Sequence, residues 1–233
     1  MAGGNFTFRN FMIRQDRCAM KVGTDGVLLG AWAAGGSRIL DIGTGTSLIA
    51  LMMAQRFGDA MVKAVETDHD AATQAAENVA ASPYADRVEV IEGDIQAYHT
   101  TELFDCIVSN PPYFCQSMKN PDTQRATARH ADSLTYGELF ASVRRLLAPG
   151  GEFSAVIPDD CLERFTGEAY MAGLTATRRT AIRTTPRKAP KRHLLAFGWS
   201  SSEPALCEEQ CLMTADGQRT DWYSKLTADF YIK

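Results

Sequence analysis

Short apolar runs alternate with segments of helical periodicity along the first half of the chain. The runs at residues 38–41, 61–66, 87–94 and 104–108 have the length of buried strands and end at polar or turn residues. The segments between them, above all 48–57 and 71–80, carry apolar residues at helical spacing. Regular alternation of strands and helices predicts a parallel, doubly wound sheet with helices on both faces.

The second half of the chain follows a different order. Residues 136–147 and 159–172 have the spacing of helices, and residues 152–157 have that of a strand. Two further strands, 174–183 and 192–199, are joined by a basic, proline-containing loop, which favours an antiparallel hairpin. The expected architecture is an α/β fold with a mostly parallel seven-stranded sheet and an antiparallel C-terminal hairpin.

A single domain is expected over residues 1–233, because no internal repeat and no linker divides the chain. Residues 1–20 place three phenylalanines among polar residues and predict an N-terminal arm, either irregular or a short hairpin. A short helix is expected over residues 24–32, because threonine and aspartate at its start can cap it. The C-terminal extension 203–233 can add a strand and a short helix.

Composition restricts the class of protein. The chain has 233 residues, of which 45% are apolar and 22% charged, as in a soluble globular protein. No apolar run is long enough to cross a bilayer, and the N-terminus lacks the pattern of a leader peptide, so we expect a cytoplasmic protein without a membrane partner. The six cysteines have no metal-ligand spacing, and no metal is expected. Nothing in the sequence indicates an obligate protein partner.

The charge pattern adds one candidate surface. The net charge is −4, so attraction to nucleic acid cannot come from the molecule as a whole. The segment between Glu168 and Glu203 has no acidic residue, however, and gathers basic ones: Arg178, Arg179, Arg183, Arg187, Lys188, Lys191 and Arg192. Such a cluster is either a nucleic-acid contact or a solvated basic loop, and the cluster alone leaves both interpretations open.

Polar side chains stand at the ends of four predicted strands. Asp41 precedes the turn of Gly43 and Gly45, where glycine lets a ligand approach the backbone and the next helix directs its first N–H groups at it. Glu66 follows after about 20 residues, where nucleotide-binding folds hold ribose hydroxyls with a carboxylate. Because parallel strands bring their carboxyl ends to one edge, these residues are expected to meet there, together with Asp94 and Asn110.

The strand at residues 104–108 is followed by an unusual sequence, Asn110-Pro111-Pro112-Tyr113. The prolines hold the chain extended and donate no hydrogen bond, which leaves the carbonyls of Asn110 and Pro111 without their usual partners. Asn110 also offers an amide, and Tyr113 a ring that can stack on a flat group. The stretch indicates either a grip for a planar substrate with an NH group or a proline-rich turn. The polar segment 114–133 that follows has the length of a substrate lid.

The chain resembles the class I methyltransferases that use S-adenosylmethionine and methylate exocyclic amino groups, in the combination of Asp41-x-Gly43-x-Gly45, Glu66, Asp94 and Asn110-Pro111-Pro112-Tyr113. Residues 23–32 and 186–193 are most similar to the bacterial tRNA1(Val) adenine-37 N6-methyltransferases. The resemblance spans roughly residues 18–199 and implies a Rossmann-like class I methyltransferase fold. Ser47 stands where the family has glycine, and we expect Ser47 to be tolerated because serine can cap the following helix.

The resemblance implies S-adenosylmethionine as the methyl donor, with S-adenosylhomocysteine as its product, and no metal. The residues that would bind this cofactor are, from the ribose and adenine to the methionine end, Glu66, Asp94, Asp41, Gly43, Gly45, Thr24 and Asp25. The acceptors for the target amino group would be Asn110 and the Pro111 carbonyl, within the catalytic motif that Pro112 and Tyr113 complete, and Tyr113 would stack on the target base. The expected partner is tRNA, bound by Phe114, Arg187, Lys188, Lys191 and Arg192.

The implied activity is methyl transfer to N6 of an adenine in tRNA, with A37 of the anticodon loop of tRNA1(Val) as the expected target. Protein glutamine N5-methyltransferases of release factors are an alternative, because a glutamine amide is also a planar NH2 group. They usually carry a helical N-terminal domain, whereas only about 35 residues precede the first strand here. DNA or rRNA adenine N6-methylation is a further alternative. A non-catalytic nucleic-acid-binding domain is disfavoured by the intact acids and Asn110.

Overall fold

A computed structural model gives the fold and describes residues 4–113, 134–199 and 204–232. Phe114, expected to contact RNA, and the segment 114–133, expected to form a lid, lie outside the described residues. At the centre is a sheet of β3 (Arg38–Ile42), β4 (Met61–Glu66), β5 (Val88–Glu92), β6 (Phe104–Ser109), β7 (Leu147–Pro158), β8 (Leu174–Arg183), β9 (Arg192–Trp199) and β10 (Leu206–Cys211).

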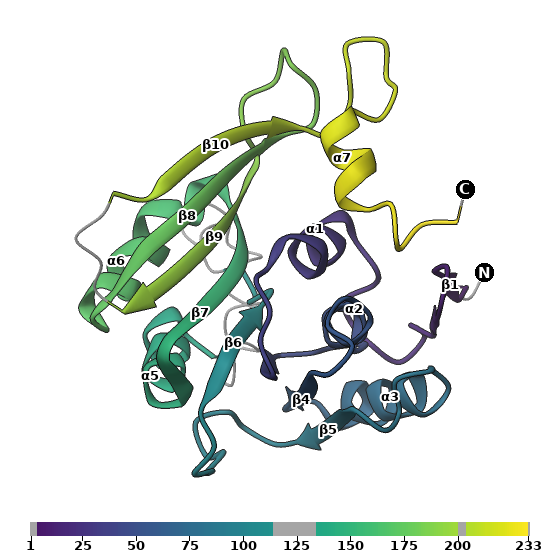
Figure 1. The fold of residues 1–233 in the computed structure, drawn as a ribbon, viewed down its shortest axis with the longest axis vertical. Coiled ribbons are helices and arrows are strands. Elements are labelled where there is room, and N and C mark those ends of the chain that lie inside the picture. The colour runs from purple at the N-terminus through teal and green to yellow at the C-terminus, as the bar shows by residue number, and fades with distance from the viewer. Residues whose placement is uncertain (1–3, 114–133, 200–203, 233) are drawn as a thin grey trace, which may run out of the picture.

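The strand order in this sheet is β10-β8-β9-β7-β6-β3-β4-β5 (Figure 1). Strand β9 is antiparallel to both of its neighbours, β7 and β8, and every other neighbouring pair is parallel. The mostly parallel sheet and the antiparallel hairpin of β8 and β9 are therefore confirmed. Loop 184–191 connects these two strands beyond the end of the sheet (Figure 1).

The described sheet has eight strands, so the expected number of seven was too small by one. The additional strand is β10, the strand that the C-terminal extension was expected to be able to add. It pairs with β8 from Leu206 opposite Arg178 to Cys211 opposite Arg183. Its first four residues are exposed, including two glutamates. An edge strand held by backbone hydrogen bonds needs little apolar surface, and β10 therefore has no strong sequence pattern.

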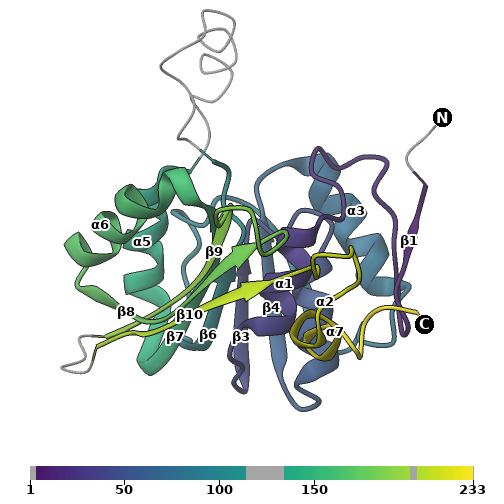
Figure 2. The ribbon, with the colours of Figure 1, turned by 90° about the horizontal axis from the view of Figure 1, so that it is seen from above.

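Helices cover both faces of the sheet (Figure 2). They are α1 (Thr24–Trp32), α2 (Leu48–Arg56), α3 (His69–Ala80), α5 (Tyr136–Leu146), α6 (Leu162–Met171) and α7 (Asp221–Leu226), with a 3-10 turn at Asp159–Cys161. One apolar core lies between the sheet and α1 and α2, and a second lies beneath α5 and α6. Among the described helices, none has the length and apolar content needed to span a membrane.

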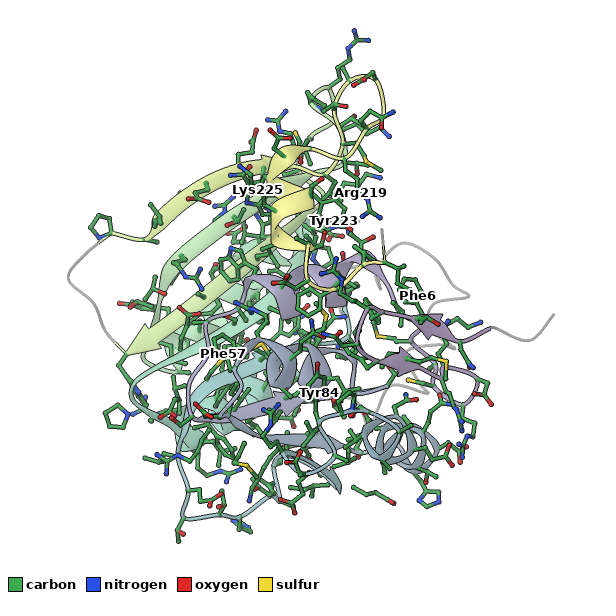
Figure 3. The ribbon with its side chains drawn as sticks, turned by 45° about the vertical axis from the view of Figure 1, so that its right-hand side comes forward. Phe6, Phe57, Tyr84, Arg219, Tyr223 and Lys225 are labelled. Carbon is green, nitrogen blue, oxygen red and sulfur yellow. The ribbon has the colours of Figure 1, made fainter. Side chains whose placement is uncertain are left out.

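The two ends of the chain pack together beside α1 and α2. Strands β1 (Phe6–Thr7) and β2 (Met12–Ile13) form the short hairpin that was one of the two expectations for the arm. The guanidinium of Arg219 lies over the rings of Tyr223 and Tyr231, and Figure 3 labels Arg219 and Tyr223. The Tyr231 ring contacts that of Phe6. The C-terminal extension therefore covers the N-terminal hairpin, and both belong to the first core.

Residues 14–23, here called the strap, run from this hairpin to α1 across the end of α3. Two buried amide side chains of α3 hold the strap. Asn78 accepts from the N–H of Arg14 at 2.9 Å and donates to its carbonyl at 2.9 Å. Gln74 accepts from the N–H of Arg17 at 3.1 Å and donates to the Asp16 carboxylate at 2.7 Å. Because both amides are satisfied and buried, they fix the path of the strap.

Asn78→Ala is expected to lower the free energy of unfolding by about 2 kcal/mol, because it leaves two part-buried backbone groups of Arg14 and the buried Thr46 carbonyl without their partner. Urea denaturation measures the change. Glu77→Ala, one residue earlier on the same helix, is the matched control. It removes only a partly exposed ion pair with Arg17 and should cost less than about 1 kcal/mol. Equal losses in the two variants would contradict the anchoring role of Asn78.

Candidate active site

The site forms where the strand order reverses. From β3 the chain continues through α2, β4, α3 and β5 on one side, and it then returns to β6 on the other side of β3. Asp41 lies opposite Val108, and Ile42 lies opposite Ser109. The segments that follow β3 and β6 therefore begin side by side. The segment after β3 is the glycine turn, and the segment after β6 begins with Asn110. Ligands of doubly wound sheets bind at such a reversal point.

Three residues of the turn between β3 and α2 adopt positive φ angles. Gly43 has φ 70° and Gly45 has φ 56°, which glycine tolerates and other residues rarely adopt. Ser47 has φ 62°. The expectation that Ser47 caps α2 was wrong, because its side chain makes no capping hydrogen bond and its buried hydroxyl lacks a partner among the described residues. Ser47 therefore occupies a position for which glycine is the better residue.

Asp41 lies beneath the turn with no exposed surface. Its Oδ2 accepts from the Thr44 hydroxyl at 2.6 Å and from the Ala50 N–H at 3.1 Å. Its Oδ1 is buried and has no hydrogen-bond partner in the described part of the chain. Burial of the carboxylate raises the pKa of Asp41 to about 7, although the Thr44 hydroxyl and the Ala50 N–H oppose this. Asp41 therefore shapes the turn from beneath, and its Oδ1 is a buried acceptor without a partner in the described part of the chain.

Glu66, at the end of β4, is bonded to the backbone around it. Its Oε2 accepts from Gly45 N–H at 2.8 Å, and its Oε1 accepts from Thr67 and Asp68 N–H at 2.9 and 3.0 Å. A carboxylate has about four acceptor sites, so one remains for a ribose hydroxyl while these bonds persist. Asp94 is exposed beyond β5, and its Oδ1 accepts from the Gln96 N–H at 2.8 Å.

A cavity of about 320 Å³ lies between the strap, the first turn of α1, the glycine turn and the end of β6. The expected site residues that line it are Thr24, Asp25, Gly43, Gly45, Asn110, Tyr113 and Arg192. Asp41, Glu66, Asp94, Pro111 and Pro112 are not part of its lining. The structure therefore brings the glycine turn and the Asn110 motif into one cavity, while Glu66 and Asp94 stand at the neighbouring strand ends.

Hydrogen bonds and an ion pair join several residues that line this cavity. The Tyr113 hydroxyl lies 3.0 Å from Oδ2 of Asp25 and 3.2 Å from Oδ1 of Asn110, and it can donate to either. Oδ1 of Asp25 forms an ion pair with Arg192 at the start of β9. Burial of the hydroxyl, together with the negative charge of Asp25, raises the pKa of Tyr113. Asp25 thus connects the motif after β6 with the end of loop 184–191.

The basic residues of the C-terminal hairpin fall into two groups. Four have partners within the fold: Arg178 with Glu152, Arg179 with His193, Arg183 with Glu209, and Arg192 with Asp25. Arg187, Lys188 and Lys191 are exposed on loop 184–191 and form no ion pair with any described residue. Arg192 therefore belongs to the cavity, and these three residues make up the exposed basic loop.

Two parts of the site have no signal in the sequence pattern. The strap contributes Met20 and Lys21 to the cavity wall, and the amides of Gln74 and Asn78 hold the strap in place. The sequence of the strap has no periodicity of apolar residues. Gln74 and Asn78 occur within an ordinary helical pattern, which gives no sign of their contacts with the strap. Within residues 4–113, 134–199 and 204–232 no group of His, Cys, Asp or Glu side chains could hold a metal ion.

The fold, with a glycine turn and an Asn-Pro-Pro-Tyr motif at the reversal point, defines a class I methyltransferase. The family described as methyltransferase small domain matches residues 22–165. The tRNA1(Val) (adenine(37)-N6)-methyltransferase of Bacteroides thetaiotaomicron is 49% identical, over 100% of this chain and 99% of its own length. The chain therefore belongs to the methyltransferase small domain family. Within this family it groups with the relatives named tRNA1(Val) (adenine(37)-N6)-methyltransferase.

Solved structures support the fold. A predicted O-methyltransferase from Agrobacterium tumefaciens has a TM-score of 0.66 at 19% identity and covers 88% of this chain and 96% of its own. The glycopeptide N-methyltransferase MtfA complexed with (S)-adenosyl-L-homocysteine has a TM-score of 0.57 at 14% identity, over 77% of this chain and 90% of its own. At these identities the likeness establishes a methyltransferase fold and nothing about the substrate.

Asp41→Asn is expected to stabilise the protein increasingly as the pH rises. The folded-state pKa is about 7 and the ordinary value is 3.8, so the wild-type protein loses stability as the pH rises between them. The neutral asparagine avoids this loss. The stability difference between variant and wild type should grow by roughly 2 kcal/mol between pH 5.5 and pH 8 in urea denaturation. Asp59→Asn, at an exposed acid, should show no such growth, and a pH-independent effect of Asp41→Asn would refute the buried-charge account.

Proposed function

We propose that this protein transfers a methyl group from S-adenosylmethionine to N6 of an adenine in tRNA, with A37 of tRNA1(Val) as the target. The observation that carries the proposal is the shared cavity, which both the glycine turn and Asn110 line. Full-length relatives at 49% and 48% identity that are named for this activity support the choice of substrate. A tRNA substrate also implies that the enzyme acts in the cytoplasm.

The residues present fit the proposed cofactor. Glycines with positive φ leave the turn open to a ligand, and Asp41 keeps a buried acceptor without a partner in the described chain. Glu66 has one acceptor site left for a ribose hydroxyl, and exposed Asp94 can accept from the adenine amino group. Thr24 and Asp25 also line the cavity, and they would receive the methionine part. S-adenosylhomocysteine would be the product.

The chemistry requires a better nucleophile and accurate alignment. When bound, S-adenosylmethionine supplies an activated sulfonium methyl group. The target adenine nitrogen is a weak nucleophile because its lone pair is delocalised into the ring. Asn110 Oδ1 and the Pro111 carbonyl accept its two hydrogens, which favours a pyramidal nitrogen and stabilises the positive charge that develops. Holding the reacting atoms in line can lower the barrier by about 7–11 kcal/mol in favourable cases.

Tyr113 stands next to the acceptors and is 41% exposed, so its ring is accessible to a base. Stacking of the target adenine on Tyr113 offsets the cost of removing the base from its neighbours, a few kcal/mol. A base in an anticodon loop is easier to extract than one in a duplex. The exposed basic loop of Arg187, Lys188 and Lys191 can contact the tRNA backbone, which compensates for the negative net charge of the whole chain.

Incubation of the protein with labelled S-adenosylmethionine and tRNA lacking the modification should place the label in N6-methyladenosine, as measured by mass spectrometry of nucleosides. Asn110→Ala should lower the transfer rate at least 100-fold, or about 2.7 kcal/mol, because an acceptor for the amino group is lost. Binding of S-adenosylhomocysteine should change less than about threefold. Label in a release-factor glutamine instead of tRNA would refute the proposal, and equal loss of binding would assign Asn110 to the cofactor.

Replacing Arg187, Lys188 and Lys191 together by Gln should weaken tRNA binding about tenfold or more near physiological salt. It should also make the dependence of log K on log salt less steep by about 2 to 3 units, because up to three phosphate contacts are lost. Filter binding over a range of salt concentrations measures both effects. Single-site Lys225→Gln on α7 is the control for a charge change outside the loop. Unchanged binding in the triple variant would show that the loop is only a solvated basic segment.

A further inference from the structure

A second cavity, of about 480 Å³, lies beside α6 and is bounded by β8, β9 and the start of β10. It shares no lining residue with the cavity of the active site. Its volume is typical of sites that bind small molecules. The wall of this second cavity includes three apolar and three charged residues: Leu162, Ala176, Leu195, Asp159, Glu163 and Arg179.

The buried ring of His193 holds two of these charged residues. Nε of Arg179 lies 3.3 Å from Nδ1 of His193, and Nε2 of His193 lies 2.7 Å from Oδ1 of Asp159. Because an arginine only donates, Nδ1 is the acceptor, and the Nε2–H group donates to Asp159. The His193 side chain is 1% exposed, so the two charged side chains are attached to the core of the protein.

The other polar atoms of the three charged residues are unpaired. The terminal amino groups of Arg179, Oδ2 of Asp159 and the Glu163 carboxylate form no hydrogen bond or ion pair with any described residue. A simple anion in this cavity would meet two carboxylates, and a simple cation would meet the guanidinium. The second cavity instead suits a ligand that combines acceptors and donors with apolar surface, as a nucleobase does.

Guanine matches this set of groups. Its O6 and N7 atoms together accept two hydrogen bonds from the fork of an arginine. Its N1–H group and its N2 amino group lie on the Watson–Crick edge and can donate to carboxylates. Since the donors and the acceptors lie on different edges of the base, one guanine can bind the arginine and a carboxylate at once. The Watson–Crick edge is accessible only when the base is unpaired.

A hydrogen bond connects the second cavity with the exposed basic loop. The N–H of Asp159 donates to the carbonyl of Lys191 at 3.1 Å. Lys191 is the last of the three basic residues to which the proposed function assigns the tRNA backbone, and Arg192 after it lines the cavity of the active site. The loop therefore adjoins both cavities, and an RNA bound to the loop lies within reach of each.

We propose that the second cavity binds an unpaired guanine of the tRNA while the target adenine occupies the active site. Arg179 donates to O6 and N7, and Glu163 and Asp159 accept from N1–H and the N2 amino group. This inference rests on the tRNA substrate of the proposed function. Phosphate contacts of the basic loop carry no information about sequence, whereas a base held in this way lets the enzyme select its tRNA.

Two single substitutions test the site by filter binding of unmodified tRNA. Glu163→Ala should weaken binding about tenfold, because an acceptor for the guanine edge is lost. Arg179→Lys keeps the charge, loses the fork and should also weaken binding. Asp160→Ala is the matched control, because Asp160 is exposed and does not line the cavity. Removing a negative charge without a base contact should leave tRNA binding unchanged or slightly stronger.

The guanine itself is tested with tRNA transcripts in which inosine, which lacks the N2 amino group, replaces guanosine at random positions. The fraction bound by the wild type should be depleted of inosine at one unpaired position. This depletion should disappear in Glu163→Ala, whereas depletion that reflects the folding of the tRNA should persist in both proteins. A depletion pattern that is identical in the two proteins would overturn the inference.

The remaining outcomes separate this inference from the proposed function. If the wild type neither binds nor methylates tRNA, the proposed function is wrong. If the wild type methylates tRNA and Glu163→Ala binds it equally well or more tightly, the guanine site is wrong while the function stands. Equal weakening by Asp160→Ala and Glu163→Ala would assign both effects to the structure of the turn before α6 and overturn the inference as well.

Discussion

The pairing of β3 with β6 is the constraint on which the site depends. Asp41 lies opposite Val108, and Ile42 lies opposite Ser109. The segments that follow the two strands therefore start next to each other at the same edge of the sheet. The Ser109 hydroxyl donates to the Ile42 carbonyl at 2.9 Å, which secures this register at the last pair. A shift by one residue would turn every side chain of β6 to the opposite face. The glycine turn and the Asn110 amide would then no longer share a cavity.

Several parts of the fold could be predicted because their patterns are local. The bounds expected for β4, β8 and β9 agree with those observed, since each is an extended segment bounded by polar or turn residues. The meeting of the glycine turn and Asn110 was predictable because parallel strands align their carboxyl ends. Edge strand β10 lay outside the seven-stranded count and was expected only as a strand that the C-terminal extension can add, because backbone pairing with β8 holds it and its exposed residues carry no apolar alternation.

The remaining features depend on contacts between residues far apart in the sequence. Gln74 and Asn78 follow the helical pattern of α3 like any polar residue, and their role arises only where the strap crosses that helix. In the sequence, Arg192 is one of several neighbouring basic residues. In the structure, it forms an ion pair with Asp25, which places it in the cavity. Ser47 was expected to cap α2, but the path of the turn forces a positive φ that orients its hydroxyl into the interior without a partner among the described residues.

The contacts of Asp25 explain how the site can keep an acceptor for its substrate. The Tyr113 hydroxyl has one proton and two nearby acceptors, the Asp25 carboxylate at 3.0 Å and the Asn110 amide at 3.2 Å. A hydrogen bond to a charged acceptor is the stronger one, so the proton resides mainly on the Asp25 side. Arg192 holds Asp25 in place from the other side. The Asn110 oxygen therefore stays open to an incoming amino group, while the hydroxyl is held and the ring of Tyr113 keeps its orientation for stacking.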